Sequence, residues 1–221
     1  MKFHESNLNA LCLGASFLGS GGGGETKLDA KICKILLKDQ QSISILSVDS
    51  FDDEALILPI AFIGPLVIHD KMPDLEMFHK ILKAVESDHQ RPISAIMPGE
   101  IGGGNALSAM IASLIHGVPL VNADLIGRAF PELSMCSLSL IPNDIPICAY
   151  LSSPKGNLYR FNCVDIKQLE RAARQLCILE NSSLIMAIYP MTGEQAKKVV
   201  IRDSYSQAIQ IRSEERRVGK E

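Results

Sequence analysis

Two polar loops of this chain carry the side chains best suited to acid–base chemistry. Glu100 lies in a glycine-rich turn, and Asp124 directly follows an apolar run. A carboxylate in the place of Asp124 can act as a general base, hold a ring N–H, or cap the next turn, and for Glu100 the alternative to a functional role is a solvated loop charge. Arg128 adds a permanent planar cation that suits a carboxylate or paired carbonyls. Its alternative role is an ion pair with Glu132 across one helical turn.

The turn after Glu100 is rich in glycine and ends at a predicted helix start. Gly103 and Gly104 precede Asn105, so their amides are predicted to lie where the helix dipole favours a negative or carbonyl oxygen. Asn105 either contacts a ligand or serves only as the helix cap.

A longer glycine run, residues 19–24, formally fits the Gly-x-Gly-x-x-Gly fingerprint of dinucleotide-binding folds, with Asp49 as the downstream acid. That fingerprint requires a preceding strand, whereas residues 8–18 have the apolar spacing of a helix. An anion- or carbonyl-binding nest that includes Gly22 and Gly23 is therefore favoured, and a flexible connector is the alternative.

The elements around the two polar loops form a predicted βαβ unit. Residues 93–97 have the pattern of a strand, 106–116 of a helix that is apolar nearly all round, and 118–123 of the partner strand. Parallel strands joined by one right-handed crossover end at the same edge of a sheet, so the loops that follow them should lie side by side. The side chains expected to converge on one crevice are those of Glu100, Asn105, Asp124, Arg128 and Glu132.

Helices and strands alternate along the rest of the chain, which predicts an α/β fold: a layered sheet with a parallel βαβ core and flanking helices. The other predicted helices cover residues 8–18, 26–37, 72–86 and 165–179, with a last short one after Thr192. The other predicted strands cover residues 43–48, 56–68, 137–141, 145–151, 158–163 and 184–189. The nearest feature to a domain boundary lies around residues 163–165.

The composition is that of an ordinary globular protein of 221 residues with a formal net charge of -3. No basic stripe precedes residue 212, which argues against nucleic-acid binding. No apolar window reaches the length of a membrane span and no secretory pattern begins the chain, so we expect no membrane association and a cytoplasmic location. The six cysteines form no Cys-x-x-Cys pair and no histidine has metal-ligand spacing, so we expect reduced core thiols and no metal or other cofactor.

The last ten residues, 212–221, differ from everything before them. They can be back-translated into a sequence that looks like a common sequencing-adapter read, so we interpret them as a scar outside the fold. The alternative is the charged end of a terminal helix.

Four segments together resemble the S-methyl thiohydantoin desulfurase-like family. They are the N-terminal glycine run, the turn at residues 97–105, the string Asp-x-x-Gly-Arg-Ala-Phe-Pro-Glu at 124–132, and Tyr-Pro-Met-Thr-Gly at 189–193. The resemblance runs from about residue 8 to about residue 211. It implies an N-terminal α/β domain over residues 8–164, the start of a C-terminal region over 165–211, and a β-rich C-terminal portion that is largely missing because of truncation.

The resemblance also implies an activity, the hydrolysis of small cyclic imide-like compounds such as S-methyl thiohydantoin, which yields hydantoin and methanethiol, or of a related ring. In this interpretation Asp124 or Glu100 activates water, glycine amides hold negative charge on the ring, and Arg128 anchors a carbonyl or carboxylate. The residues assigned to the site are Asp124 and Glu100 as catalytic groups and Gly22, Gly23, Gly103, Gly104, Asn105, Arg128 and Glu132 as substrate-binding groups.

A second function from a different class remains open. The chain would then be a non-catalytic ligand-binding or partner subunit of a hydantoinase- or oxoprolinase-type assembly, and a homo-oligomer or a hydantoinase-like partner is compatible with either function. Turnover by the isolated protein would distinguish the two.

Overall fold

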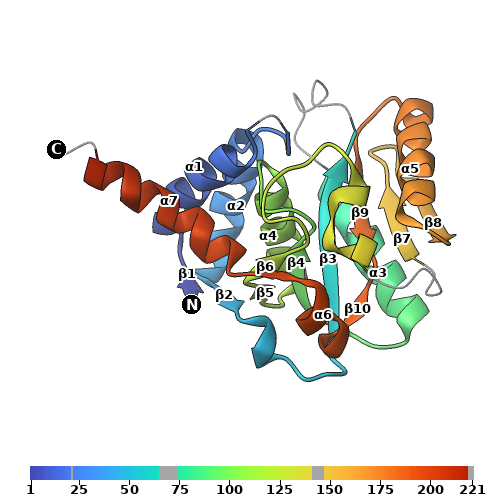
Figure 1. Ribbon diagram of the computed structural model, residues 1–221, viewed down its shortest axis with the longest axis horizontal. Coiled ribbons are helices and arrows are strands. Elements are labelled where there is room, and N and C mark those ends of the chain that lie inside the picture. The colour runs from blue at the N-terminus through green and yellow to red at the C-terminus, as the bar shows by residue number, and fades with distance from the viewer. Residues whose placement is uncertain (21, 65–73, 141–146, 219–221) are drawn as a thin grey trace.

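The computed structural model describes residues 1–20, 22–64, 74–140 and 147–218, with side chains through residue 211. Within these residues, nine strands form one mixed sheet in the order β1-β2-β5-β4-β3-β9-β7-β8, with β10 paired to β3 (Figure 1). The strands are β1 (Lys2–Phe3), β2 (Ile43–Leu46), β3 (Leu56–Ile63), β4 (Ile93–Pro98), β5 (Leu120–Val121), β7 (Ile147–Ser152), β8 (Leu158–Cys163), β9 (Leu184–Ile188) and β10 (Met191–Thr192).

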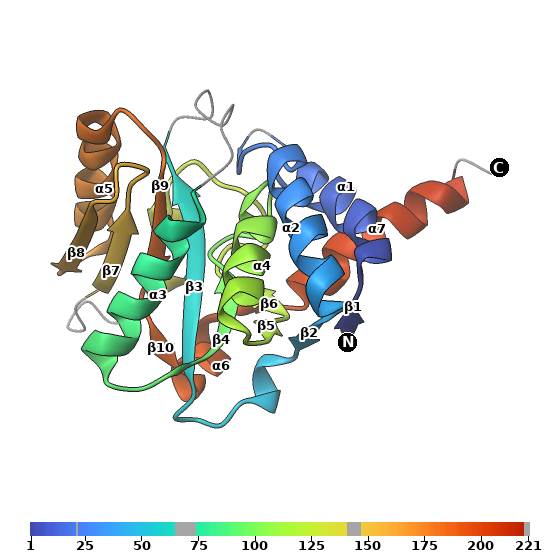
Figure 2. The ribbon, with the colours of Figure 1, turned by 180° about the vertical axis from the view of Figure 1, so that it is seen from behind.

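Helices cover both faces of this sheet. Their bounds are α1 (Leu8–Leu18), α2 (Lys27–Gln40), α3 (Leu75–His89), α4 (Asn105–His116), α5 (Ile166–Glu180), α6 (Gly193–Val199) and α7 (Ser204–Val218). One hydrophobic core joins the sheet to α1, α2, α3, α4 and the start of α7. A second core joins the opposite face to α5, α6 and the loop at residues 125–138. The layered α/β architecture predicted from the sequence is therefore confirmed (Figure 2).

The βαβ unit that positions the polar loops is also confirmed. β4 and β5 are parallel, with Ile96 opposite Leu120, and α4 connects them. Residues 105–114 of α4 are all buried, as a helix that is apolar nearly all round requires. The partner strand is shorter than predicted, because it ends at Val121 and a separate strand, β6 (Ala123–Asp124), pairs with β11 (Ile201–Arg202).

Local patterns located most of the remaining elements. Asp165 caps α5 by accepting the Gln168 N–H at 2.6 Å, and Thr192 and Gln195 form a capping box at the start of α6. The glycine run follows a helix, α1, and not a strand, so the dinucleotide fingerprint lacks its structural context. The end of the predicted strand at residues 65–68 and the predicted helix start at Met72 fall outside the described residues.

One predicted element is wrong. Residues 137–140 form a 3₁₀ turn in place of a strand: their alternating serines and leucines resemble a strand, but Leu140 is 85% exposed and only Leu138 is buried. Helix α7 was expected only in part, since a terminal helix was the alternative for residues 212–221. It packs so closely on α1 that a Cβ added at Gly14 would lie 1.7 Å from the Ala208 carbonyl oxygen. Its ribbon continues through residue 218 and extends beyond the rest of the fold (Figures 1 and 2).

The sheet is continuous across residues 163–165, where a domain boundary was expected. β9, which follows α5, lies between β3 and β7 and is antiparallel to both. The segments before and after the expected boundary therefore build one sheet together. All six cysteines are free thiols. In the part of the chain that the structure describes, no helix is long and apolar enough to cross a membrane.

Candidate functional site

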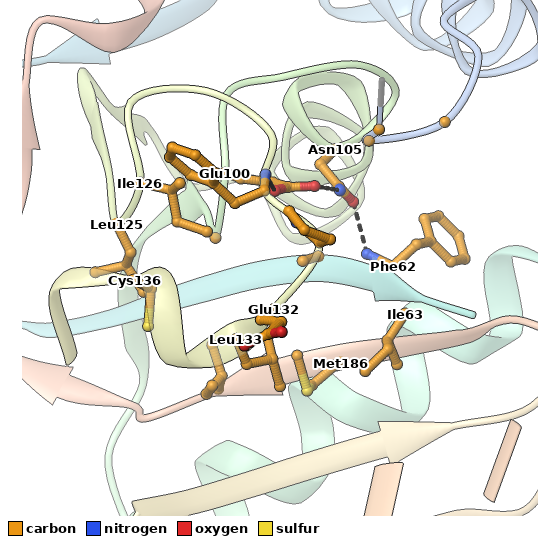
Figure 3. Close-up of a pocket in the computed structure, with 18 of the residues that line it drawn as sticks. Phe62, Ile63, Glu100, Asn105, Leu125, Ile126, Glu132, Leu133, Cys136 and Met186 are labelled. Carbon is orange, nitrogen blue, oxygen red and sulfur yellow. Dashed lines mark hydrogen bonds between the residues drawn. The ribbon is translucent and has the colours of Figure 1, made fainter. Parts of the chain in front are cut away.

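A pocket of about 250 Å³ opens at the carboxyl ends of β3 and β4, on the face of the sheet that carries α5 (Figure 3). The loop at residues 125–136 forms one side, and the N-terminal glycine run approaches from α1. The polar residues and glycines expected from the sequence that line it are Gly22, Gly23, Glu100, Asn105 and Glu132. Asp124, Arg128, Gly103 and Gly104 do not line it, although all four were expected at the site.

Glu100 supplies a half-buried carboxyl group to the pocket. Its Oε1 accepts a hydrogen bond from Asn105 Nδ2 at 2.6 Å, and its Oε2 accepts the Phe130 N–H at 3.2 Å. Burial raises the pKa of Glu100 to about 7, against the lowering effect of these two hydrogen bonds and with a further small increase from Asp124. Both the protonated and ionised forms of Glu100 are therefore populated near neutral pH.

Asn105 has a different role from the helix cap considered above. The N-cap residue is Gly104, whereas Asn105 is the first residue of α4 and is 3% exposed. Its Oδ1 accepts the Phe62 N–H at 2.7 Å, and its Nδ2 donates to Glu100 (Figure 3). Since each end of the amide has its own partner, its orientation is fixed, and Asn105 joins the end of β3 to the carboxylate that follows β4.

Asp124 lies behind the pocket and not in it, so the expectation that it borders the crevice is wrong. The residue is 0% exposed. Its Oδ2 accepts the N–H groups of Ile101 and Gly127, both at 2.8 Å, and its Oδ1 accepts the Ser204 hydroxyl at 2.6 Å. Burial raises its pKa to about 6, and these donors lower it. With its lone pairs directed at protein donors, Asp124 fixes the turn after Glu100 to the loop after β6.

The two glycine-rich turns pack against each other. The Gly103 N–H donates to the Ala15 carbonyl at 2.7 Å, and the Gly104 N–H donates to the Gly23 carbonyl at 2.7 Å. A Cβ at Gly103, where φ is +67°, would lie 2.4 Å from the Gly23 carbonyl. Both amides already donate hydrogen bonds within the protein. The expectation that Gly103 and Gly104 present their amides to a ligand is therefore wrong.

The N-terminal run keeps donors available. Gly22, Gly23 and Gly24 line the pocket. The Gly22 N–H donates to the Gly19 carbonyl, whereas among the described residues the N–H groups of Gly23 and Gly24 have no hydrogen-bond acceptor. Among the described residues of the glycine run, Gly23 and Gly24 therefore keep an amide for the predicted nest.

The ion pair between Arg128 and Glu132, the alternative role considered for Arg128, is not formed among the described residues. The segment is not helical, and the Arg128 guanidinium lies over the Phe130 ring, 5.5 Å from its centroid. Phe130 lines the pocket, so Arg128 touches the site only through this ring. Glu132 is exposed at the pocket and accepts a hydrogen bond from Ser134 Oγ at 3.2 Å.

Arg174 on α5 lines the pocket and was missed from the sequence. Its Nη2 donates to the Pro131 carbonyl at 2.6 Å and to Glu170 Oε1 at 2.7 Å, and Glu170 Oε2 accepts the Leu133 N–H at 3.0 Å. The two side chains hold residues 131–133 in place. The spacing of Glu170 and Arg174 by one helical turn was visible in the sequence, but no local pattern could show that both residues bind a loop distant in the sequence.

The remaining lining is largely apolar. It is contributed by Ala61, Phe62, Ile63, Leu125, Ile126, Phe130, Pro131, Leu133, Cys136, Met186 and Ile188. Burial raises the pKa of the Cys136 thiol, which keeps that sulfur protonated and a poor nucleophile. Among the described residues, no group of three or more histidine, cysteine, aspartate or glutamate side chains is close enough to hold a metal ion.

Comparison with solved structures identifies the same fold elsewhere. The crystal structure of a protein from Chromobacterium violaceum is similar to this chain with a TM-score of 0.80 and 21% identity, and the similarity covers 100% of this chain and 63% of that one. This chain therefore spans less than two thirds of the length of that protein. Comparison with curated proteins gives no match.

Two family models match consecutive parts of the chain. The model of the S-Me-THD-like N-terminal domain matches residues 6–162, and the model of the C-terminal domain matches residues 164–218. The second match assigns residues 164–218 to the C-terminal domain, so the expectation that this domain is largely missing is not borne out. Because the two models together span nearly the whole sequence, the chain belongs to the S-Me-THD-like family.

Proposed function

We propose that this protein hydrolyses a small cyclic imide-like ring, releasing methanethiol from an S-methyl thiohydantoin or acting on a closely related ring. The observation that carries the proposal is Glu100: a half-buried carboxyl group with a pKa of about 7, hydrogen-bonded to Asn105 and lining a small pocket beside apolar side chains. A proton-transfer group is most effective when its pKa lies near the working pH.

The proposed reaction replaces a ring carbon–sulfur bond with a carbonyl. Water adds to the ring carbon that bears the S-methyl group, and ionised Glu100 takes one water proton. The carbon–sulfur bond then breaks, Glu100 returns that proton to the departing sulfur, and methanethiol leaves. The second water proton ends on the ring nitrogen, so the product is the hydantoin.

Donors near Glu100 are suited to hold the negative charge that develops on the ring as water adds. Gly23 and Gly24 line the pocket, and their N–H groups have no acceptor among the described residues. Asn105 uses one Nδ2 hydrogen for Glu100, which leaves the second for a ring atom. Fixed donors of this kind stabilise developing charge without reorganising during the reaction.

The role of general base falls to Glu100 and not to Asp124 in this proposal. Asp124 is fully buried and accepts hydrogen bonds from Ile101, Gly127 and Ser204, so substrate water has no path to its lone pairs. Asp124 is a positioning residue that holds the turn bearing Glu100.

The test measures methanethiol released by the purified chain from the S-methyl thiohydantoin made from glycine. Glu100→Gln should lower kcat/KM by about 10²–10⁴-fold, the usual contribution of positioned proton transfer. Glu194→Gln, on the exposed surface of α6, serves as the control and should match the parent protein. Full activity in Glu100→Gln would contradict the role given to Glu100. Binding of the ring without methanethiol release would favour the non-catalytic subunit of a hydantoinase- or oxoprolinase-type assembly.

A further inference from the structure

The segment at residues 129–132 runs along the pocket without helical or strand structure. Phe130, Pro131 and Glu132 are exposed residues, and all three line the pocket. Exposed residues bury little apolar surface, so packing alone does little to fix the backbone here. The position of this segment therefore depends on its polar contacts with other elements.

Two carboxylates from different elements accept N–H groups that lie three residues apart on this loop. Glu100, after β4, accepts the Phe130 N–H at 3.2 Å, and Glu170, on α5, accepts the Leu133 N–H at 3.0 Å. Glu100 and Leu133 lie on different sides of the pocket (Figure 3). The loop is thus held at one end by the pocket carboxylate and at the other end by α5.

Arg174 adds a second contact from α5. Its Nη2 donates to the Pro131 carbonyl at 2.6 Å, and its Nε and Nη2 donate to Glu170 Oε1 at 2.9 and 2.7 Å. Glu170 therefore uses one oxygen for Arg174 and the other for the Leu133 N–H, and its side chain is only 12% exposed. Hydrogen bonds to a charged group that is largely shielded from water are among the stronger ones in proteins.

Helix α5 gives Glu170 and Arg174 a rigid base. Asp165 caps its first turn, and Leu169, Ala173 and Cys177 are buried along the face that packs on the sheet. The two side chains can therefore hold the loop at a fixed distance from the sheet.

The position of the loop affects the proton affinity of Glu100. Burial raises the pKa of Glu100 to about 7, the Phe130 N–H and then the Asn105 amide lower it, and Asp124 raises it slightly. The other charged or titratable side chains that line the pocket are Glu132, Cys136 and Arg174. A loop that moved away from Glu100 would remove the Phe130 donor and leave the ionised carboxylate less stable.

On the basis of the proposed function, we infer that Glu170 and Arg174 are positioning residues for the reaction, which hold the loop so that the Phe130 N–H remains hydrogen-bonded to Glu100. The geometry behind this inference is the run of contacts from α5 to Leu133 and Pro131 and from Phe130 to Glu100. The two residues act on the general base through the backbone of the loop.

Glu170→Ala and Arg174→Ala test the inference because they remove charges of opposite sign. Carbon NMR of labelled glutamate side chains follows the titration of Glu100 in each variant. Loss of the Phe130 donor should raise the pKa of Glu100 by about one unit in both. Charge alone would raise this pKa in Arg174→Ala and lower it in Glu170→Ala. A Glu100 pKa that falls or stays constant in Glu170→Ala would overturn the inference.

Two further variants serve as controls. Arg171→Ala removes the same charge from an exposed position of α5 that does not line the pocket, so Glu100 should titrate as in the parent. Glu170→Gln keeps an oxygen that can accept the Leu133 N–H, so the pKa of Glu100 should not rise. An increase in Glu170→Gln as large as that in Glu170→Ala would contradict the inference.

The parent protein provides a test that needs no substitution. The amide signal of Phe130 should move with pH in step with the carbon signal of Glu100, because the Phe130 N–H donates to the carboxylate that titrates. A Phe130 amide that does not follow Glu100 would overturn the inference.

Kinetics separate this inference from the proposed function. In the methanethiol assay with the glycine-derived ring, the acidic limb of kcat/KM against pH reports the base of the free enzyme. It should shift upward in both alanine variants by the amount that NMR gives for Glu100. An unshifted limb beside a raised NMR pKa would contradict the proposed role of Glu100 as base. Absence of turnover in the parent would remove the proposed function, whereas the NMR titrations would still decide whether Glu170 and Arg174 position the Phe130 N–H.

Discussion

Ser204, the first residue of α7, donates its hydroxyl hydrogen to Oδ1 of Asp124 at 2.6 Å. Both residues are almost completely buried, at 1% and 0% exposed. Because the other oxygen of Asp124 accepts the Ile101 N–H, this bond connects the C-terminal helix to the residue that follows Glu100. The position of the pocket carboxylate thus depends on a segment of chain far away in the sequence.

Ser204→Ala should lower the free energy of unfolding by about 1–3 kcal/mol, because a buried carboxylate loses a donor that water cannot replace. The matched control is Ser206→Ala, in the same helix, whose hydroxyl accepts from the partly exposed Asn122 and not from a buried charge. Urea denaturation of both variants measures the difference. Equal losses would contradict the weight placed on the Ser204–Asp124 bond.

Glu100→Gln should change how stability depends on pH. Burial raises the pKa of Glu100 from 4.5 to about 7, so the folded protein holds a proton that the unfolded chain releases. The stability that this group contributes is fully present below about pH 4.5 and is lost as the pH rises through about 7. As the pH rises from about 4 to about 8, the free energy of unfolding of the variant should therefore increase relative to that of the parent by on the order of 3 kcal/mol. Denaturation at several pH values tests this, and a constant difference would refute it.

Asn105→Asp should raise the pKa of Glu100 further. The substitution keeps an acceptor for the Phe62 N–H but replaces the Nδ2 donor with a second carboxylate beside Glu100 Oε1. Two carboxylates in contact share a proton, so the upper pKa of the pair should exceed that of Glu100 in the parent by one unit or more.

Carbon NMR of labelled glutamate side chains follows this titration directly. Asn157→Asp is the matched control. The Asn157 amide donates to Glu180, the last residue of α5, and not to Glu100. Its Glu100 signal should titrate as in the parent. A Glu100 pKa that does not move in Asn105→Asp would show that the Asn105–Glu100 hydrogen bond is absent in solution.

Gly103→Ala should destabilise the protein far more than Gly117→Ala. Both glycines have positive φ, at +67° and +79°, so each substitution incurs the left-handed backbone cost of about 1–2 kcal/mol. A Cβ at Gly103 would also lie 2.4 Å from the Gly23 backbone, whereas a Cβ at Gly117 meets nothing within 4 Å. The difference between the free energies of unfolding of the two variants, measured by heat or urea, gives the additional loss of stability from forcing the two glycine-rich turns apart. Similar losses would mean that the turns are not in close contact.

Sequence patterns predicted most elements of the fold because those elements depend on residues that are close together in the sequence. The apolar spacing of α1 and α4 and the capping residues Asp165 and Thr192 depend on neighbours within a few positions. The strand prediction for residues 137–140 was wrong because a short alternating pattern does not distinguish a strand from a 3₁₀ turn. Helix α7 was largely missed because, of its described side chains, only Tyr205, Ala208 and Ile209 pack in the apolar core.

The candidate site was predicted only in part, for a related reason. The topology rule located Glu100 and Asp124 correctly at one edge of the sheet, and the Ile101 N–H to Asp124 bond confirms that their loops are adjacent. It could not indicate that Ser204 would cover Asp124, or that the lining cation would be Arg174 and not Arg128. Those outcomes depend on how α5 and α7 dock, and docking leaves no short-range pattern in the sequence.

The place of β9 in the sheet has a consequence for synthesis. The ribosome releases the chain from its N-terminus. The edge of β3 that contains Ile63 can pair with β9 only after Leu184 has been synthesised. Until then the apolar edge of β3 is open and the β7–β8 hairpin has no strand to join. Pairing residues so far apart in the sequence costs loop-closure entropy and slows folding. The nascent protein therefore passes through a stage at which a half-built sheet exposes its edge to other chains before the pocket exists.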